Sequence, residues 1–288
     1  MSEIRALLDA GLVHHKAGRL SEAEGLYNQV RGLEPENTEV NHLSGLLAFH
    51  NGNAADAAQF FERAVAADPA NVKYLGNLGA AWLVSGRPED ALGVLERAIE
   101  IDPDGIDVLN NLAAAYRETG QFSDAIAVAN RAVSLRPDDA ELQTNLAIGL
   151  LGTEQSNDAL SAAQRAVKLA PKSPEAQNAL GLAYVALRQS KNAISAFQVA
   201  IEVGPDFADA VRSLALAYQE ARRLGEAAET YLKATGALAG GCCGLCRSGA
   251  DVEDDGAFRC RRRSVSSGNC AQPWKSSLSF ESVIQSDW

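Results

Sequence analysis

The sequence predicts an all-α protein, a right-handed α-solenoid of about seven stacked helix-turn-helix units of 34 residues each. Three observations predict this fold. Prolines recur every 34 residues, small residues recur in the same register, and each interval contains two amphipathic helical stripes separated by a turn signal. The prolines of this register are Pro35, Pro69, Pro103, Pro137, Pro171 and Pro205.

Small residues recur at positions where two helices are expected to cross. Alanine or glycine at a crossing lets the helix backbones approach to the short end of the usual range of about 8–10 Å. A single helix pair cannot bury both of its faces, so successive pairs stack around one shared core. One small column is Ala23, Ala57, Ala91, Ala125, Ala159, Ala193 and Ala227. A second joins leucine to glycine or alanine at Leu78–Gly79, Leu112–Ala113, Leu146–Ala147, Leu180–Gly181 and Leu214–Ala215.

The interval that closes at Pro103 illustrates the order of elements. Leu78 and Trp82 have helical spacing and belong to the apolar stripe of a first helix. Gly86 interrupts this pattern, and Pro88 suits the first turn of a second helix. The second helix is expected to end before Pro103, because proline cannot continue the helical hydrogen-bond ladder.

The register divides residues 4–239 into seven repeats. The last is incomplete, because Ala239 stands where the closing proline is expected. In the first repeat, Ser21 and Glu24 have the spacing of a capping box at the start of the second helix. The repeats are 4–37, 38–71, 72–105, 106–139, 140–173, 174–207 and 208–239. Repeats five to seven lack the glycine between helices and have Glu154, Arg188 and Arg222 in its place.

These columns resemble the tetratricopeptide repeat (TPR) family over residues 4–239. The resemblance implies a superhelix whose first helices line a concave groove, and a non-catalytic scaffold that binds extended peptide or protein segments there. The arrays of bacterial TPR proteins and of protein O-GlcNAc transferases look similar. The alternative function is therefore the substrate-recruiting portion of such a transferase, or of another modifying enzyme, whose catalytic domain is absent from this chain.

Charge and composition exclude several functions. The chain has 288 residues and a net charge of −11, and the first 239 residues carry all of that imbalance. An acidic body repels phosphate, which disfavours nucleic-acid binding, and no apolar run reaches the roughly 18 residues of a membrane-spanning helix. The expected partners are other proteins or peptides, including basic or disordered segments and further copies of this chain. The cytoplasm is the expected location, because the N-terminus has no secretory signal.

The sequence contains no motif for catalysis or for a cofactor. A phosphate-binding loop, a dinucleotide fingerprint and an HExxH pair are all missing. Helical phase brings His15, His42 and His50 toward one side of the first two repeats. Surface histidines are far commoner than metal ligands, so we expect no enzyme activity, no cofactor and no metal.

Asparagines in one column are the main candidates for groove binding. Asn77, Asn111 and Asn145 each precede the leucine of a repeat and therefore border the groove. An amide both donates and accepts hydrogen bonds, so such a ladder suits an extended peptide backbone without selecting its side chains. The alternative is a solvated surface column. The candidate groove also includes Asn110, Asn178 and Arg117.

A second column is acidic, with Lys73 as its exception. Acids in the first turn of a helix suit the helix dipole, and they also steer basic ligands toward the groove. These two interpretations are compatible. The acids are Glu39, Asp107, Glu141, Glu175 and Asp209.

Residues 240–288 have a different composition and contain every cysteine of the chain. We expect this tail to be unstructured, with a zinc module or a redox switch as alternatives. The abrupt loss of the repeat also fits a shifted reading frame, and hence a truncated relative of a longer protein that combines repeats with an enzyme domain. The cysteines are Cys242, Cys243, Cys246, Cys260 and Cys270.

Overall fold

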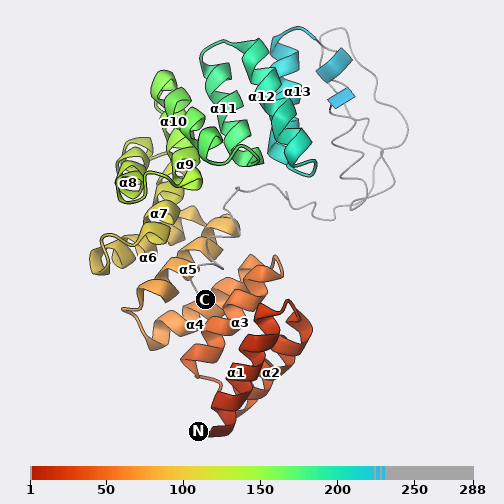
Figure 1. Cartoon of the computed structure of the whole chain (residues 1–288). Coiled ribbons are helices and arrows are strands. Elements are labelled where there is room, and N and C mark those ends of the chain that lie inside the picture. Colours follow the sequence, from red (N-terminus) through yellow and green to blue (C-terminus); the bar gives the residue numbers. More distant parts are fainter. Residues whose placement is uncertain (1, 224, 228, 231–288) are drawn as a thin grey trace, which may run out of the picture. The chain divides into compact units, whose positions relative to one another are not determined.

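The computed structural model describes residues 2–223, 225–227 and 229–230, and every regular element within these residues is a helix (Figure 1). The tail and its cysteines lie outside the described residues. The helices are α1 (Ser2–Lys16), α2 (Leu20–Leu33), α3 (Thr38–His50), α4 (Ala54–Ala67), α5 (Val72–Val84), α6 (Pro88–Ile101), α7 (Ile106–Glu118), α8 (Phe122–Leu135), α9 (Ala140–Leu151), α10 (Ser156–Leu169), α11 (Pro174–Ala186), α12 (Ser190–Val203) and α13 (Ala208–Glu220). None of the described helices combines the length and the apolar character needed to cross a bilayer.

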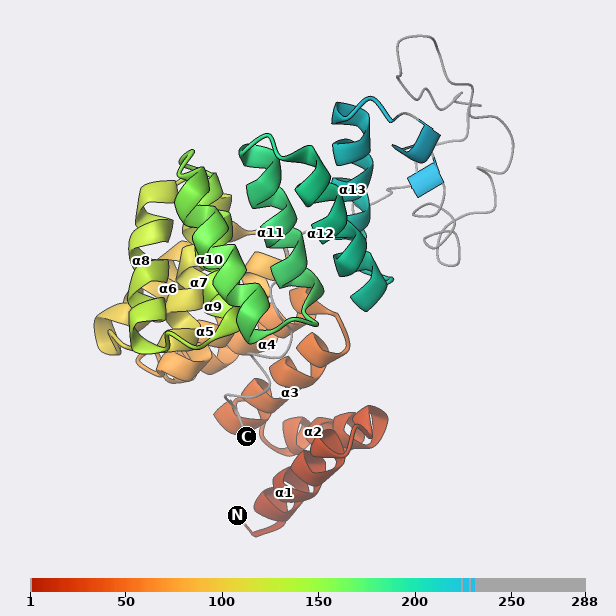
Figure 2. The same cartoon turned by 45° about the horizontal axis from the view of Figure 1, so that its top comes forward.

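The described chain falls into two compact halves. The N-terminal half ends at Pro137 and contains four helix hairpins, α1–α2 to α7–α8, and the C-terminal half begins at Asp138 and contains α9 to α13. Within each half, every helix packs against its neighbour in sequence, and the first helices of successive hairpins also contact one another. Figures 1 and 2 both show α11, α12 and α13 side by side in this manner. The predicted all-α stack of helix pairs is thus confirmed within each half.

Complementary residue sizes hold the two helices of a hairpin together. A glycine on the first helix faces a large side chain on the second: a Cβ added to Gly79 would lie 2.5 Å from Cγ of the fully buried Leu95. Gly11 faces Tyr27, Gly45 faces Phe61 and Gly181 faces Phe197 in the same way. In the fourth and fifth repeats both columns hold alanine, in the buried pairs Ala113 with Ala129 and Ala147 with Ala163. The seventh repeat departs from this pairing, with Ala215 in the first column and Tyr231, which lies outside the described residues, in the second. In the described pairs, close packing therefore limits the combined volume of the two side chains and does not fix the identity of either residue.

The turn between the helices of a hairpin needs a left-handed residue. Gly86 has φ of 73°, and the N–H of Arg87 donates to the carbonyl of Trp82 at 2.8 Å to close the helix end. Arg188 has nearly the same φ, 60°, and the N–H of Gln189 closes the α11 end at 2.8 Å. The repeats without a glycine therefore keep the turn geometry, although a non-glycine residue in this conformation costs roughly 1–2 kcal/mol.

Of the two predicted helix starts, the one at Pro88 is confirmed and the one at Ser21 is wrong. Pro88 occupies the first turn of α6, as predicted. The capping box at Ser21 is wrong: α2 begins one residue earlier, at Leu20, its N-cap is Arg19, and no side chain caps it. The short turn after α1 places Ser21 inside the helix, where its hydroxyl cannot occupy the capping position.

A histidine lies in the core of the first hairpin. His15 is 4% exposed, and its Nδ1 atom lies 3.5 Å from the hydroxyl oxygen of Tyr27. The His50 ring lies 5.8 Å from the His15 ring, centroid to centroid. Burial, and secondarily repulsion from His50, lowers the pKa of His15 to about 4.

We predict that filling the space at Gly79 destabilises the protein. The Cβ of Gly79→Ala meets Leu95, which is closed in on all sides, so the free energy of unfolding should fall by about 1–3 kcal/mol in urea unfolding. Gly93→Ala on α6 is the matched control, because a Cβ there meets nothing within 4 Å. It should raise stability by up to about 1 kcal/mol. Equal gains from both substitutions would contradict the packing rule.

We also predict that acid weakens the first hairpin through His15. The folded-state pKa of about 4 lies below the ordinary value of 6.5, so the unfolded chain takes up the proton first. Stability should be unaffected above pH 6.5 and should fall by on the order of 2–3 kcal/mol as the pH decreases to about 4. Urea unfolding across this range should show a smaller loss for His15→Gln, whereas the control His14→Gln should keep the loss. An unchanged pH slope in His15→Gln would refute this assignment.

Candidate functional site

Buried polar side chains gather on the first helices of the hairpins. Each of the buried polar residues among those described lies on a first helix, and the second helices bury only apolar residues. Buried polar groups require hydrogen-bond partners, so they fill a core less favourably than apolar residues do. Their concentration on the first helices therefore indicates that these helices have a role besides packing. They are His15, Asn41, His42, Ser44, Asn77, Asn110, Asn111, Gln143, Thr144, Gln177 and Asn178. We call the surface formed by the first helices of each half its first-helix face.

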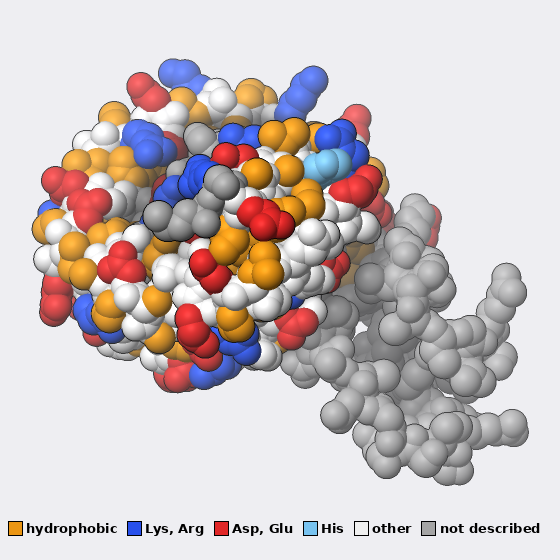
Figure 3. Space-filling view, turned by 90° about the horizontal axis from the view of Figure 1, so that it is seen from below, with side chains coloured by type: hydrophobic (Ala, Val, Ile, Leu, Met, Phe, Trp, Pro, Cys, Tyr) orange, Lys and Arg blue, Asp and Glu red, His pale blue; other side chains and the backbone are white. Residues whose placement is uncertain are grey.

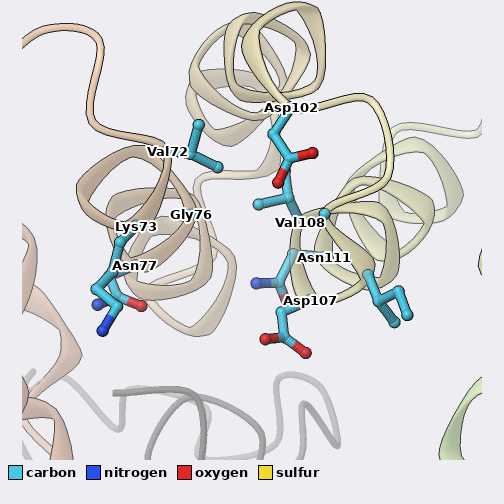
Figure 4. Close-up of a pocket in the computed structure, with 10 residues that line it drawn as sticks. Val72, Lys73, Gly76, Asn77, Asp102, Asp107, Val108 and Asn111 are labelled. Atoms are coloured by element: carbon cyan, nitrogen blue, oxygen red, sulfur yellow. The ribbon is translucent and has the colours of Figure 1, made fainter. Parts of the chain in front are cut away.

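In the N-terminal half, this face contains a pocket of about 260 Å³ between α5 and α7. Figure 4 shows Lys73 and Asn77 of α5 on one side of the opening and Asp107 and Asn111 of α7 on the other. Val72 and Val108 form apolar walls, and Asp102 lies at the turn between α6 and α7. The pocket therefore combines an apolar interior with amide and charged groups at its rim.

A glycine opens this pocket. The corresponding column holds Leu8, His42, Asn110, Thr144, Asn178 and Arg212 in the other repeats, whereas the third repeat has Gly76. A Cβ at Gly76 would lie 3.2 Å from Cγ2 of Val108, so the glycine also allows α5 and α7 to approach closely. The pocket was not predicted from the sequence, although the absence of a side chain at Gly76 is visible in this column.

The structure brings two of the three ladder asparagines together. Asn77 and Asn111 are each 6% exposed and line the same pocket. The Nδ2 atom of Asn77 lies 3.0 Å from Nε2 of His42, whose ring in turn lies 4.8 Å from that of Tyr74. Asn145 lies on α9 in the C-terminal half. Asn77 is therefore oriented by a neighbouring first helix.

The remaining candidates of the N-terminal half lie on α7. Asn110 is buried next to Asn111, and Asp107 lies in the first turn at the pocket rim. Arg117, near the end of the helix, lies 3.8 Å from Glu118, and burial lowers the pKa of its guanidinium. Arg117 does not line the pocket.

In the C-terminal half, the predicted acids begin successive first helices. Glu141, Glu175 and Asp209 lie in the first turns of α9, α11 and α13. Ser173 donates to Glu175 at 2.7 Å, and Arg212 forms an ion pair with Asp209 at 2.8 Å. Their first-turn positions agree with the helix-dipole interpretation. Asn178 on α11 is buried, and its Oδ1 atom has no hydrogen-bond partner.

The three histidines singled out in the sequence do not converge on one point. His15 and His50 approach each other, but His42 packs against Tyr74 and Asn77 instead. Across the described part of the chain, no three His, Cys, Asp or Glu side chains lie close enough to hold an ion. Figure 3 shows acidic, basic and apolar side chains interspersed on the face in view. Charge is therefore distributed on that face rather than gathered in one patch.

Comparison with known proteins places these features in a family. Sequence models of the tetratricopeptide repeat match residues 8–72, 44–106, 83–148, 144–202 and 178–241. A search among curated proteins finds no match.

Solved structures of TPR proteins have the same fold. A TPR protein from Parabacteroides merdae is 14% identical, with a TM-score of 0.71 over 82% of this chain and 93% of that one. The Cut9–Hcn1 structure of the APC/C is 17% identical, with a TM-score of 0.66 over 79% of this chain and 45% of that one. TTC0263 from Thermus thermophilus is 21% identical, with a TM-score of 0.56 over 63% and 99% of the two chains. From the repeat matches and this fold, the chain belongs to the tetratricopeptide repeat family.

Proposed function

We propose that the first-helix face of the N-terminal half binds an extended segment of another protein, and that the chain acts as a non-catalytic scaffold. The observation that carries this proposal is the pair Asn77 and Asn111 at a pocket opened by Gly76. Membership of a family of interaction scaffolds supports it, and one structure of similar fold comes from the hetero-tetramer Cut9–Hcn1.

The amides suit the backbone of the bound segment. An asparagine amide carries N–H donors and an acceptor oxygen on one side chain, which match the alternating carbonyl and N–H groups of an extended chain. The contact of Asn77 with His42 fixes the direction of its side chain, which reduces the entropy lost on binding. Asn145 offers the same group on the first-helix face of the C-terminal half.

The pocket suits one side chain of the bound segment. Val72 and Val108 would contact aliphatic carbons, and the carboxylates of Asp102 and Asp107 favour a cationic end group. Lys73 at the opposite rim disfavours a second positive charge close by. We therefore propose a segment with a single lysine or arginine at this point, in agreement with the negative net charge of the chain.

The asparagines can be tested with peptides selected on the protein itself. Twelve-residue peptides from a random phage library would be enriched on the full chain and their dissociation constants measured by calorimetry. Asn77→Ala/Asn111→Ala should weaken binding by at least about tenfold, because each lost hydrogen bond contributes roughly 0.5–1.5 kcal/mol.

The matched control is Asn130→Ala/Asn157→Ala, which removes two exposed asparagines from second helices. This variant should bind as the natural sequence does. The proposal fails if the library yields no binder, or if the ladder variant and the control bind equally well. Light scattering on the same samples measures the molar mass of the protein, and so identifies any selected peptide that changes its self-association.

The pocket can be tested separately at Gly76. Gly76→Asn introduces the residue that Asn110 and Asn178 provide in the same column and should fill the cavity. Selected peptides with a lysine or arginine in the pocket should lose about tenfold or more in affinity, and their alanine-substituted forms should lose little. Gly93→Asn on α6 is the control. Equal losses for both kinds of peptide would contradict the assignment of the pocket.

A further inference from the structure

A second pocket lies outside the groove, between α2 of the first hairpin and the pair α3–α4 of the second. Its volume is about 210 Å³. Its lining includes Glu24, Tyr27, Arg31, Ser44, Asp56 and Phe60. All of them belong to the N-terminal half, and none lines the pocket at Gly76.

Three columns that are apolar in repeats two to six, or in repeats three to six for the column of Ser44, become polar at this one place. Ser44 occupies the column of Leu78 and the leucines of all later repeats, so a large side chain is missing from the core. Arg31 occupies the column of Val65 and Ile99, and Glu24 that of Ala58 and Leu92. The missing leucine creates the cavity, and the two charged residues make its rim polar.

The hydroxyl of Ser44 has no partner. The side chain is 5% exposed, and no hydrogen bond reaches its Oγ atom. Other helical hydroxyls donate to the carbonyl four residues earlier, as Ser85 does to Ala81 at 2.6 Å and Thr144 to Ala140 at 2.8 Å. A buried hydroxyl without a hydrogen bond costs about 1–3 kcal/mol, and a ligand that bonds it would recover this energy.

Both signs of charge face the same space. The guanidinium of Arg31 lies 4.6 Å from the centre of the Phe60 ring, donates to Asn28, and forms no ion pair with a described carboxylate. Burial, and secondarily the nearby Arg63, lowers the pKa of Arg31, although the carboxylate of Glu24 acts in the opposite direction. Glu24 and Asp56 supply two carboxylates, of which Asp56 accepts from Asn53 at 2.5 Å.

We propose that this pocket binds a small zwitterion of the size of an amino acid. The ligand carboxylate pairs with Arg31, its ammonium group lies near Glu24 and Asp56, and Ser44 bonds a polar atom of the ligand at the base of the pocket. Tyr27 and Phe60 cover its carbon atoms. A ligand with a single charge could pair either with Arg31 or with the carboxylates of Glu24 and Asp56, and would leave the other side of the rim without an opposite charge. A zwitterion pairs with both sides and therefore fits best.

The test is a two-dimensional NMR titration of the full chain with each common free L-amino acid at up to about 10 mM. At least one should bind with shifts centred on Ser44 and Arg31. Its N-acetyl and its C-amide derivatives, which each lack one charge, should bind at least about tenfold more weakly. Binding of the derivatives as tight as that of the free amino acid, or shifts confined to another surface, would overturn the proposal.

Variants of the pocket complete the test. Ser44→Leu restores the residue of the later repeats, so it should abolish binding while the thermal midpoint stays the same or rises. Arg31→Gln should weaken binding by at least about tenfold, whereas Arg63→Gln, an arginine that approaches the same ring without lining the pocket, should not. No shift with any amino acid would mean that water alone fills the pocket, and would refute the proposal. None of these outcomes depends on peptide binding at Asn77 and Asn111.

Discussion

The close approach of two helices within each hairpin is the constraint on which the other features depend. In the described hairpins, a large residue on the second helix lies opposite a glycine, as in Gly45 with Phe61, and an alanine lies opposite an alanine, as in Ala113 with Ala129. Packing of this kind tolerates no extra carbon, because the interior is as dense as an organic crystal. It fixes the rotation of every first helix about its axis, and so decides which column of residues faces away from the partner helix.

The proposed function depends on that fixed rotation. Once the small residues and leucines occupy the hairpin interior, the neighbouring columns of the first helix carry the buried amides. A departure from the pattern then has a local and predictable effect. Gly76 opens a pocket on the first-helix face, and Ser44 opens another between hairpins, because each lacks a side chain that the other repeats provide.

Most of the fold could be predicted from the sequence, since a repeat of 34 residues determines helix order and packing partners at once. The placement of Asn77 beside Asn111 also followed from helical phase. The contact of Asn77 with His42 could not be predicted, because it depends on how far one first helix is displaced from the next. The left-handed backbone conformation of Arg188 could not be predicted either, since tertiary packing overrides the local preference of a non-glycine residue.

The columns of the sequence show that four residues depart from the repeat, namely Gly76, Ser44, Arg31 and Glu24. They do not show that these departures produce pockets. A missing side chain predicts a cavity only if neighbouring residues do not move to fill it, and this is a property of the packed structure. The acidic column shows the opposite case: its residues lie in first turns as expected, yet Glu175 and Asp209 have partners within their own helix ends. Position alone did not separate a structural acid from one that is available to a ligand.

The most direct test of the account is a map of where a bound polypeptide lies. A peptide selected on the full chain would carry a photoreactive amino acid at each position in turn, and the cross-linked residues would be identified by mass spectrometry. The account predicts cross-links on α3, α5 and α7 that advance along the peptide in the order of the helices. Cross-links on the second helices α4, α6 and α8 would contradict it.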